Sequence, residues 1–126
     1  MYPAESNTFS VSRLKKRAEF LRAARRGRKW AAPGVVLQSF RREPDDSAAD
    51  AGVRVGFTVT KKVGNAVVRN RARRRLKAAA QEILATHGQG GVDYVLIGRA
   101  GTLKRPYSQL IGDIEAAMRK LKAYRS

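Results

Sequence analysis

The stretch KKVGNAVVRNRARRRLKAAAQEIL, residues 61–84, predicts a long helix around which the rest of the chain can be placed. Gly64 and Asn65 interrupt the pattern before this helix. Asn65 is a good N-cap because its side-chain oxygen can accept a hydrogen bond from an unpaired backbone N–H at the helix start. Beyond it, apolar residues recur at helical spacing and form one inward-facing stripe. The stripe consists of Val68, Ala72, Leu76, Ala79, Ala80 and Ile83.

The remaining surface of the helix is cationic and has no acid to neutralise it. No Asp or Glu occurs between residues 54 and 81, so like charges stand three and four residues apart. Each such pair costs roughly a few tenths of a kcal/mol in an isolated helix, and cations in the first turn also oppose the helix dipole. These penalties favour a helix that binds an external polyanion over an ordinary solvated basic face. The surface consists of Arg69, Asn70, Arg71, Arg73, Arg74, Arg75 and Lys77.

The composition of the whole chain points to the same kind of partner. Its 126 residues include 27 Lys and Arg against 10 Asp and Glu, a formal net charge of +17. Such a charge favours a nucleic acid or another anionic surface as partner and says little about the fold. The chain has no cysteine, which excludes disulfides and fits a reducing cytoplasm. No apolar run approaches the ~20 residues that span a membrane, so we expect a cytoplasmic protein without a membrane partner.

The length and the pattern of apolar residues predict a single domain, residues 1–126, with the element order α-β-β-α-β-α, and its net charge suits this domain to binding a nucleic acid. We expect a small central sheet packed by helices, which is an α/β fold of the α+β sandwich type. The first two strands alternate apolar and polar residues and are expected to pair with each other, while the third is almost continuously apolar. The predicted helices are residues 17–26, the central helix and residues 106–123, and the predicted strands are residues 35–41, 54–60 and 93–99.

The connections and strand faces complete this prediction. Residues 1–12 are expected to be flexible. Residues 43–52 hold four of the ten acids and are expected to form a surface loop. In the first strand, Val35 and Leu37 would face one side of the sheet and Phe40 the other.

No residues of the chain are arranged for catalysis or metal binding by the protein itself. The one histidine, His87, stands beside a glycine-rich turn and is interpreted as the C-terminal residue of the central helix. Carboxylates that are close in sequence, such as Asp45 with Asp46 and Asp113 with Glu115, match no acid–base or metal motif. The sequence therefore predicts a binding protein without catalytic residues and without a metal of its own.

The run RVGFTVTKKVGNAVVRNRARRRL, residues 54–76, resembles the bacterial ribonuclease P protein family. Its signature is a strand ending in a V-x-K-K-type turn, followed by G-N-A-V-x-R-N-R. Arg13 to Lys16, Glu19, Phe20 and Gly27 extend the resemblance, which covers roughly residues 13–122. It implies that the strand–helix–strand unit has a left-handed crossover, against the usual right-handed rule.

The resemblance also implies the activity and the partners. Members of the family bind a large catalytic RNA and help it remove the 5′ leader from precursor tRNA. The RNA supplies the active site and Mg²⁺, which agrees with a protein lacking catalytic residues, because metal-activated water needs no side-chain base. No obligate protein partner is implied. The alternatives are a ribosomal or RNA-chaperone protein using the same basic helix, and a nuclease acting alone.

Two RNA-binding surfaces follow from the resemblance. The catalytic RNA would bind Lys61, Lys62, Asn65, Arg69, Asn70, Arg71, Arg73, Arg74, Arg75 and Lys77. The single-stranded leader would lie in a cleft between the first helix and the sheet, lined by Lys15, Arg17, Phe20, Arg22, Arg25, Val36, Gln38, Phe40, Arg54 and Thr58.

Aromatic residues are the point on which this chain departs from the family. Ala24 and Gln38 occupy positions where an aromatic is common, so we expect weaker base stacking in the cleft. Phe20 is the candidate for stacking on a base, and its alternative role is a core residue under the first helix. Trp30 is expected to pack against the fold, and its alternative role is a platform on which a base stacks. Phe57 is expected to lie in the core.

Overall fold

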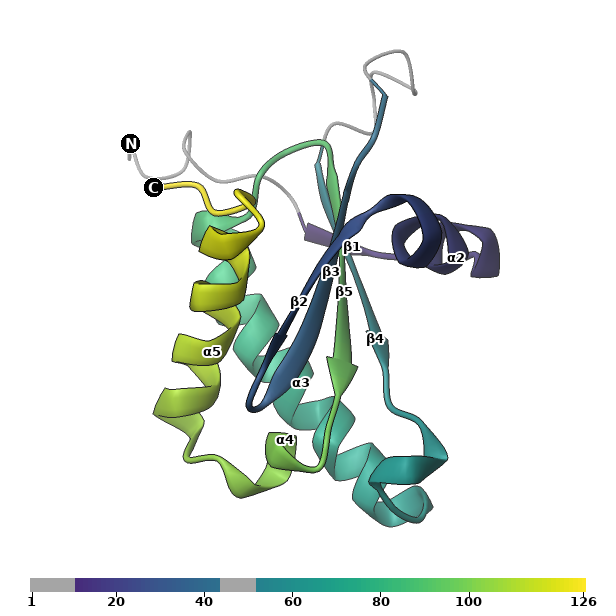
Figure 1. Ribbon diagram of the computed structural model, residues 1–126, viewed down its shortest axis with the longest axis vertical. Coiled ribbons are helices and arrows are strands. Elements are labelled where there is room, and N and C mark those ends of the chain that lie inside the picture. The colour runs from purple at the N-terminus through teal and green to yellow at the C-terminus, as the bar shows by residue number, and fades with distance from the viewer. Residues whose placement is uncertain (1–10, 44–51) are drawn as a thin grey trace.

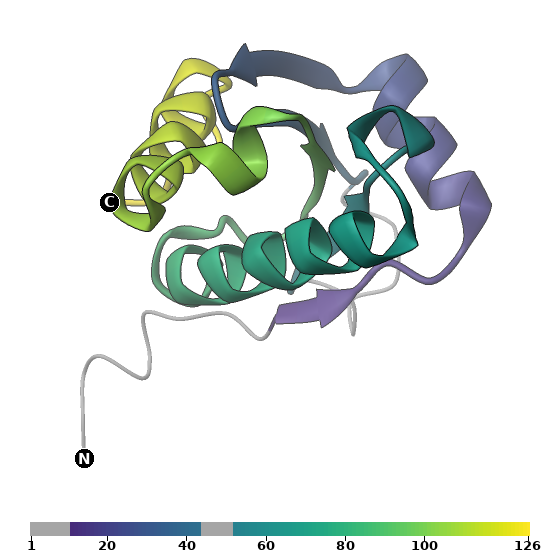
Figure 2. The ribbon, with the colours of Figure 1, turned by 90° about the horizontal axis from the view of Figure 1, so that it is seen from below.

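The computed structural model describes residues 11–43 and 52–126 and shows an open five-stranded sheet packed between helices (Figure 1). Helix α2 covers one face of the sheet, and α3 and α5 cover the other (Figure 2). This is the predicted α+β sandwich. The strands are β1 (Val11–Arg13), β2 (Arg28–Ala32), β3 (Val35–Arg41), β4 (Val53–Thr58) and β5 (Val92–Gly98). The helices are α2 (Arg17–Arg26), η2 (Lys61–Val63), α3 (Ala66–His87), α4 (Gly101–Lys104) and α5 (Tyr107–Lys120).

The strand order is β1-β4-β5-β3-β2, with β5 at the centre. β4 pairs with β5 in parallel through α3, and this crossover is left-handed, as the resemblance implied (Figures 1 and 2). β3 pairs with β5 and not with β4, so the expected pairing of the first two predicted strands is wrong. The physical reason is the apolar run of β5, because a strand buried on both faces belongs at the centre of a sheet.

Two strands, β1 and β2, and two short helices, η2 and α4, were not predicted. The strands were missed because their residues carry little hydrophobic signal. Four of the five residues of β2 are exposed, as are all three residues of β1. The expected flexible segment 1–12 is wrong at its end, since Val11 pairs with Val53. The rest of that segment, residues 1–10, and residues 44–51 of the expected loop lie outside the described residues. Helix α5 ends at Lys120, three residues before the predicted end.

The hydrophobic core lies on both faces of the sheet. On the α3 side, the predicted stripe is buried from Ala72 to Ile83, and it packs with Val35 and Leu37. On the α2 side, Phe40 belongs to a smaller cluster with Leu14, Ala23 and Val95. The expected division of β3 into two faces is therefore confirmed.

The start of α3 is fixed by its cap and by a glycine. The side chain of Asn65 accepts a hydrogen bond of 3.0 Å from the backbone N–H of Val68, which confirms the predicted N-cap. Gly64 has a φ of +157°, and a Cβ there would lie 2.8 Å from the Val68 side chain. The turn from β4 therefore enters α3 in a defined direction, which positions the cations of the first helical turns.

Candidate nucleic-acid interface

The cations of α3 lie along the end of the helix that follows η2, at one end of the molecule (Figure 1). The predicted residues divide into an outward-facing group and a group on the flanks. Lys61, Lys62, Asn65, Asn70, Arg71 and Arg74 are exposed, while Arg69, Arg73, Arg75 and Lys77 are half-buried. We call these ten residues the α3 surface.

Three arginines of the α3 surface donate hydrogen bonds to other groups of the fold. Arg69 donates to the Gly64 carbonyl at 2.9 Å, and Arg73 donates to the Asn70 side chain at 2.9 Å. Arg75 donates to the Thr102 carbonyl at 2.7 Å and lies against the Tyr107 ring, so it also holds α3 to the segment after β5. A guanidinium has five N–H donors, so each arginine keeps donors for a phosphate.

No carboxylate neutralises the α3 surface within the part of the chain that the structure describes. The ion pairs among those residues join Arg22, Arg42 and Arg54 to Asp93, Arg54 to Glu19, and Arg105 to Asp113. None of them involves a residue of η2 or α3. Among the described residues, the fold therefore brings no acid from elsewhere to compensate the like-charge repulsion that the sequence predicted.

A second feature is a hollow beside the start of α2, with a volume of about 490 Å³. It exists because β1 pairs with β4 only as far as Val55, which leaves the later residues of β4 at an open sheet edge. Phe20 covers Gly56, where a Cβ would lie 2.4 Å from the ring. The hollow therefore combines an aromatic ring with cations from two helices. We call it the α2 hollow; it is lined by Lys15, Arg17, Phe20, Phe57, Thr58, Val59 and Arg73.

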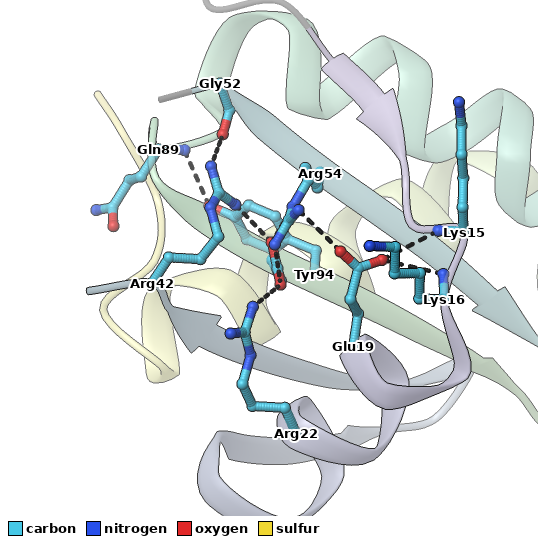
Figure 3. Close-up of polar contacts among 10 residues, drawn as sticks. Lys15, Lys16, Glu19, Arg22, Arg42, Gly52, Arg54, Gln89 and Tyr94 are labelled. Carbon is cyan, nitrogen blue, oxygen red and sulfur yellow. Dashed lines mark hydrogen bonds and ion pairs between the residues drawn. The ribbon is translucent and has the colours of Figure 1, made fainter. Parts of the chain in front are cut away.

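Three arginines from different parts of the chain converge on the buried carboxylate of Asp93 (Figure 3). Arg54 of β4 donates to it from Nε at 2.8 Å and from Nη2 at 3.0 Å. Arg42 donates to the same carboxylate, and Arg22 of α2 does so at 3.4 Å. Two predicted leader contacts, Arg22 and Arg54, are thus held by an acid that the sequence analysis had left unassigned.

Glu19 extends this ion-pair network to the start of α2. Its carboxylate accepts hydrogen bonds from the backbone N–H groups of Lys15 and Lys16, and pairs with Arg54 at 2.9 Å. Burial on its own raises the pKa of Glu19, but these two hydrogen bonds and the Arg54 charge outweigh it and lower the pKa below its ordinary value. The ionised carboxylate therefore holds the start of α2 to the sheet.

The other predicted leader residues are divided between the α2 hollow and the fold. Phe40 is buried, and the guanidinium groups of Arg22 and Arg26 lie 4.6 and 5.6 Å from the centre of its ring. Gln38 is also buried, and Val36 is half-buried. Arg25 is exposed on α2 away from the α2 hollow. The α2 hollow brings together Lys15, Arg17, Phe20 and Thr58 from the predicted set.

Sequence reasoning missed the contribution of two aromatic side chains to the surface. Phe57 was expected in the core because it alternates with valines, yet it is half-buried, lines the α2 hollow and lies 5.2 Å from the Arg13 guanidinium. Trp30 was expected to pack against the fold but is 41% exposed on β2. The alternation correctly placed Phe57 on the same face of β4 as the valines. That part of β4 is exposed because β1 is too short to pair with it, and the sequence did not indicate this.

Within residues 11–43 and 52–126, no three His, Cys, Asp or Glu side chains are grouped so that they could hold a metal ion. In the same part of the chain, no helix has the length and apolar character needed to cross a membrane. His87 ends α3, as predicted, and its ring stacks on Tyr124 at 4.4 Å.

The fold and the α3 surface define the class of protein: a small α+β protein whose long basic helix α3 has no neutralising acid among the described residues. The family model described as Ribonuclease P matches residues 10–122, and the chain belongs to that family. The Ribonuclease P protein component of Paramagnetospirillum magneticum is 55% identical over 113 residues, covering 90% of this chain and 84% of the relative. That of Gluconacetobacter diazotrophicus is 56% identical over 108 residues, covering 86% and 89%.

Solved structures of ribonuclease P proteins have the same fold. A structure of the Staphylococcus aureus RNase P protein is 25% identical, covers 90% of this chain and 97% of its own, and gives a TM-score of 0.71. The RNase P protein from Thermotoga maritima, at 21% identity and a TM-score of 0.65, supports the fold alone. Membership of the family supports a role in ribonuclease P, an endoribonuclease, over the ribosomal or RNA-chaperone alternative.

Proposed function

We propose that the chain is the protein cofactor of ribonuclease P and acts in the cytoplasm on precursor tRNA. It binds the catalytic RNA through the α3 surface and the single-stranded 5′ leader of the precursor through the α2 hollow. The observation that carries this proposal is the α3 surface itself, whose cations have no carboxylate partner among the described residues. RNA phosphates docked on this surface would neutralise its cations and remove their mutual repulsion, and that change in free energy would favour binding.

The geometry of α3 suits a folded RNA backbone. From Arg69 to Lys77 the helix rises by about 12 Å, enough to meet two or three phosphates. The backbone N–H groups at the helix start, with Lys61 and Lys62 beside them, add donors for another phosphate. Arg71 and Arg74 face outward on this stretch and are the best placed for direct contacts.

The α2 hollow supports the leader assignment through its mixed chemistry. Lys15, Arg17 and Arg73 supply charge for a phosphate, while Phe20 offers a ring on which a base could stack. Arg73 belongs to the α3 surface as well, so the two RNA sites would adjoin each other. Arg22 and Arg54 would act indirectly in this proposal, by fixing α2 over the sheet through Asp93.

Hydrolysis is assigned to the RNA component and to Mg²⁺ bound there. The protein offers no cluster of acidic or histidine ligands in its described residues that fits such an ion. The bound Mg²⁺ would activate the attacking water, and the protein residues would only bind and orient the two RNAs. No obligate protein partner is part of the proposal.

Reconstitution tests the proposed function. The chain is added to a ribonuclease P RNA at low Mg²⁺, and leader removal from precursor tRNA is followed. We expect strong stimulation by the wild-type chain and weaker binding of the catalytic RNA by Arg69→Ala/Arg71→Ala. The log–log salt dependence of binding should become less steep by roughly 0.7–0.9 for each phosphate that the variant no longer binds.

Lys104→Ala is the matched control, because Lys104 is an exposed cation outside both RNA surfaces. It should leave the salt dependence close to that of the wild type. No stimulation by the wild-type chain would refute the cofactor role, and cleavage by the protein alone would support a nuclease acting without RNA. An unchanged slope in the double variant would rule out phosphate contacts by Arg69 and Arg71.

A further inference from the structure

A second basic hollow lies at the opposite end of the strands from the start of α3, where β2 begins, β3 ends and the chain leaves α5 (Figure 1). Its volume is about 430 Å³. Four cations line it, Arg26, Arg28, Arg41 and Lys122, and no carboxylate of the described residues does. We call it the distal hollow. Neither the proposed contact with the catalytic RNA nor the α2 hollow uses it.

Hydrogen bonds fix two of these guanidinium groups at the rim. Arg28 donates to the Leu121 carbonyl at 3.2 Å, and Arg41 donates to the Gln89 side chain at 2.6 Å. Each of these bonds uses one of five N–H donors, so both arginines keep several for an anion. Arginines held in this way suit a phosphate, because charge-assisted hydrogen bonds to phosphate are strong and directional.

The backbone at Lys122 gives an independent reason to regard this place as a site. Lys122 has a φ of +56° and is the only described residue other than glycine with a positive φ. It closes α5 in a Schellman turn, in which Lys122 N–H donates to the Arg119 carbonyl at 3.1 Å and Ala123 N–H to the Met118 carbonyl at 2.8 Å. Glycine is the favoured residue at this position because it has no Cβ to strain. The chain instead places a cation there, at the edge of the distal hollow.

Trp30 adds an exposed aromatic ring beside the distal hollow. It lies on the edge strand β2, two residues after Arg28, so both side chains are on the same face of the sheet about 7 Å apart. The ring is 41% exposed, and the Lys120 ammonium lies 5.3 Å from its centre. An exposed ring next to phosphate-binding cations is typical of single-stranded nucleic-acid sites, since a base can stack on it.

We propose that Trp30 and the distal hollow bind the far part of a long single-stranded leader. The inference rests on the proposed function, in which the nearer part of the leader lies in the α2 hollow at β4. From Thr58 a strand of RNA would cross β5 and β3 on the α2 face of the sheet, a distance of about 14 Å to β2 at the usual strand spacing. Lys29 and Ala31 are exposed on that face of β2, whereas Trp30 and Arg28 lie on the opposite face of the same edge strand, so the RNA would pass round the edge of β2 to reach them. The leader is the fitting occupant because stacking on Trp30 requires an unpaired base.

The test uses the reconstituted ribonucleoprotein and precursors whose leaders are lengthened one nucleotide at a time. With the wild-type protein, we expect precursor affinity to rise a second time when the leader becomes long enough to reach β2. Trp30→Ala should remove that second rise, a decrease of about fivefold or more because one base can no longer stack. Affinity for precursors with short leaders should not change.

Lys122→Gly separates binding from folding, because the two effects have opposite signs. It removes a cation from the distal hollow and relieves the backbone strain, so we expect weaker binding of long leaders together with a Tm raised by about 3 °C. Lys104→Ala, which removes a charge elsewhere, should behave as the wild type. All these variants should bind the catalytic RNA with the wild-type salt dependence.

Three results would overturn the inference while the cofactor role stands. The first is wild-type affinity for every leader length in both Trp30→Ala and Lys122→Gly. The second is an equal loss for short and long leaders. The third is a smaller salt slope for the catalytic RNA, which would make that RNA the ligand of the distal hollow. Absence of any stimulation by the wild-type protein would instead refute the proposed function, and the inference with it.

Discussion

At the scale of single residues, Asp93 carries a charge that is removed from water and surrounded by the charges of other residues. Its side chain is fully buried, and it accepts hydrogen bonds from Arg22, Arg42 and Arg54. Removing one member of a buried ion pair is costly because the remaining charges stay buried without compensation. Asp93 thus allows three arginines to approach one another beneath α2, and it determines where that helix lies on the sheet.

We predict that Asp93→Asn lowers the free energy of unfolding by about 3–5 kcal/mol, measured by urea denaturation. The side chain keeps its shape, so the loss reports the missing charge. Asp113→Asn is the matched control, since its partner Arg105 is 30% exposed whereas Arg42 is 3% exposed. A smaller loss is expected there because water can solvate the freed arginine. Equal losses in the two variants would show that burial of the Asp93 site has no special cost.

The sequence could not reveal this site, because the partners are distant along the chain. Arg22 and Asp93 are 71 residues apart, and Arg54 and Asp93 are 39 apart. Only the tertiary fold places them together, because Arg54 and Asp93 face each other across the parallel pair β4–β5 and Arg22 reaches them from α2. The resemblance, together with their positive charge, therefore assigned Arg22 and Arg54 to the leader. By contrast, the N-cap Asn65 depends on residues within one turn and could be predicted from the sequence.

At the scale of secondary-structure elements, how well a helix or strand could be predicted from the sequence depends on the strength of its hydrophobic pattern. Helix α3 and the two faces of β3 were predicted correctly because each buries a regular set of apolar residues. β1 and β2 carry no such pattern and were missed. The left-handed crossover came from the resemblance alone, because physical rules favour the opposite hand.

The attachment of α2 to the sheet leads to a prediction about pH. The pKa of Glu19 is lowered in the folded protein, so the unfolded chain binds a proton more readily than the folded chain at acidic pH. The stabilisation is therefore complete above the ordinary pKa of a glutamate, about 4.3, and is lost as pH falls through the lowered value. We expect the stability difference between wild type and Glu19→Gln to be constant near neutral pH and to shrink in acid.

Denaturation curves measured across this pH range check the prediction. The amide protons of α2 should also exchange faster in acid relative to those of α3, after correction for the intrinsic pH dependence of exchange, because Glu19 acts at the start of α2. A difference between the two proteins that persists unchanged at low pH would mean that Glu19 contributes by packing and not by its charge.

At the scale of the whole molecule, the net charge of +17 acts on folding and on binding in opposite ways. The α3 surface and the distal hollow lie at opposite ends of the strands, so RNA bound at one end leaves the other accessible (Figure 1). Like charges gathered in one small fold repel one another and destabilise it. The same charges attract RNA, and salt screens both interactions over a distance of about 10 Å at 0.1 M and about 3 Å at 1 M.

We therefore predict that added salt raises the Tm of the free protein by a few degrees while it weakens binding of the catalytic RNA. The Tm should rise less with salt in Arg69→Ala/Arg71→Ala, because two charges of the repelling helix are already gone. Calorimetry of the two proteins over a salt series, with chloride and not sulfate as the anion, provides the measurement. Sulfate is avoided because it binds cations and strengthens apolar burial by exclusion. A Tm that falls with salt would mean that attractive ion pairs, such as those of Asp93, outweigh the repulsion along α3. In that case RNA binding to the α3 surface would relieve no net repulsion in the free protein.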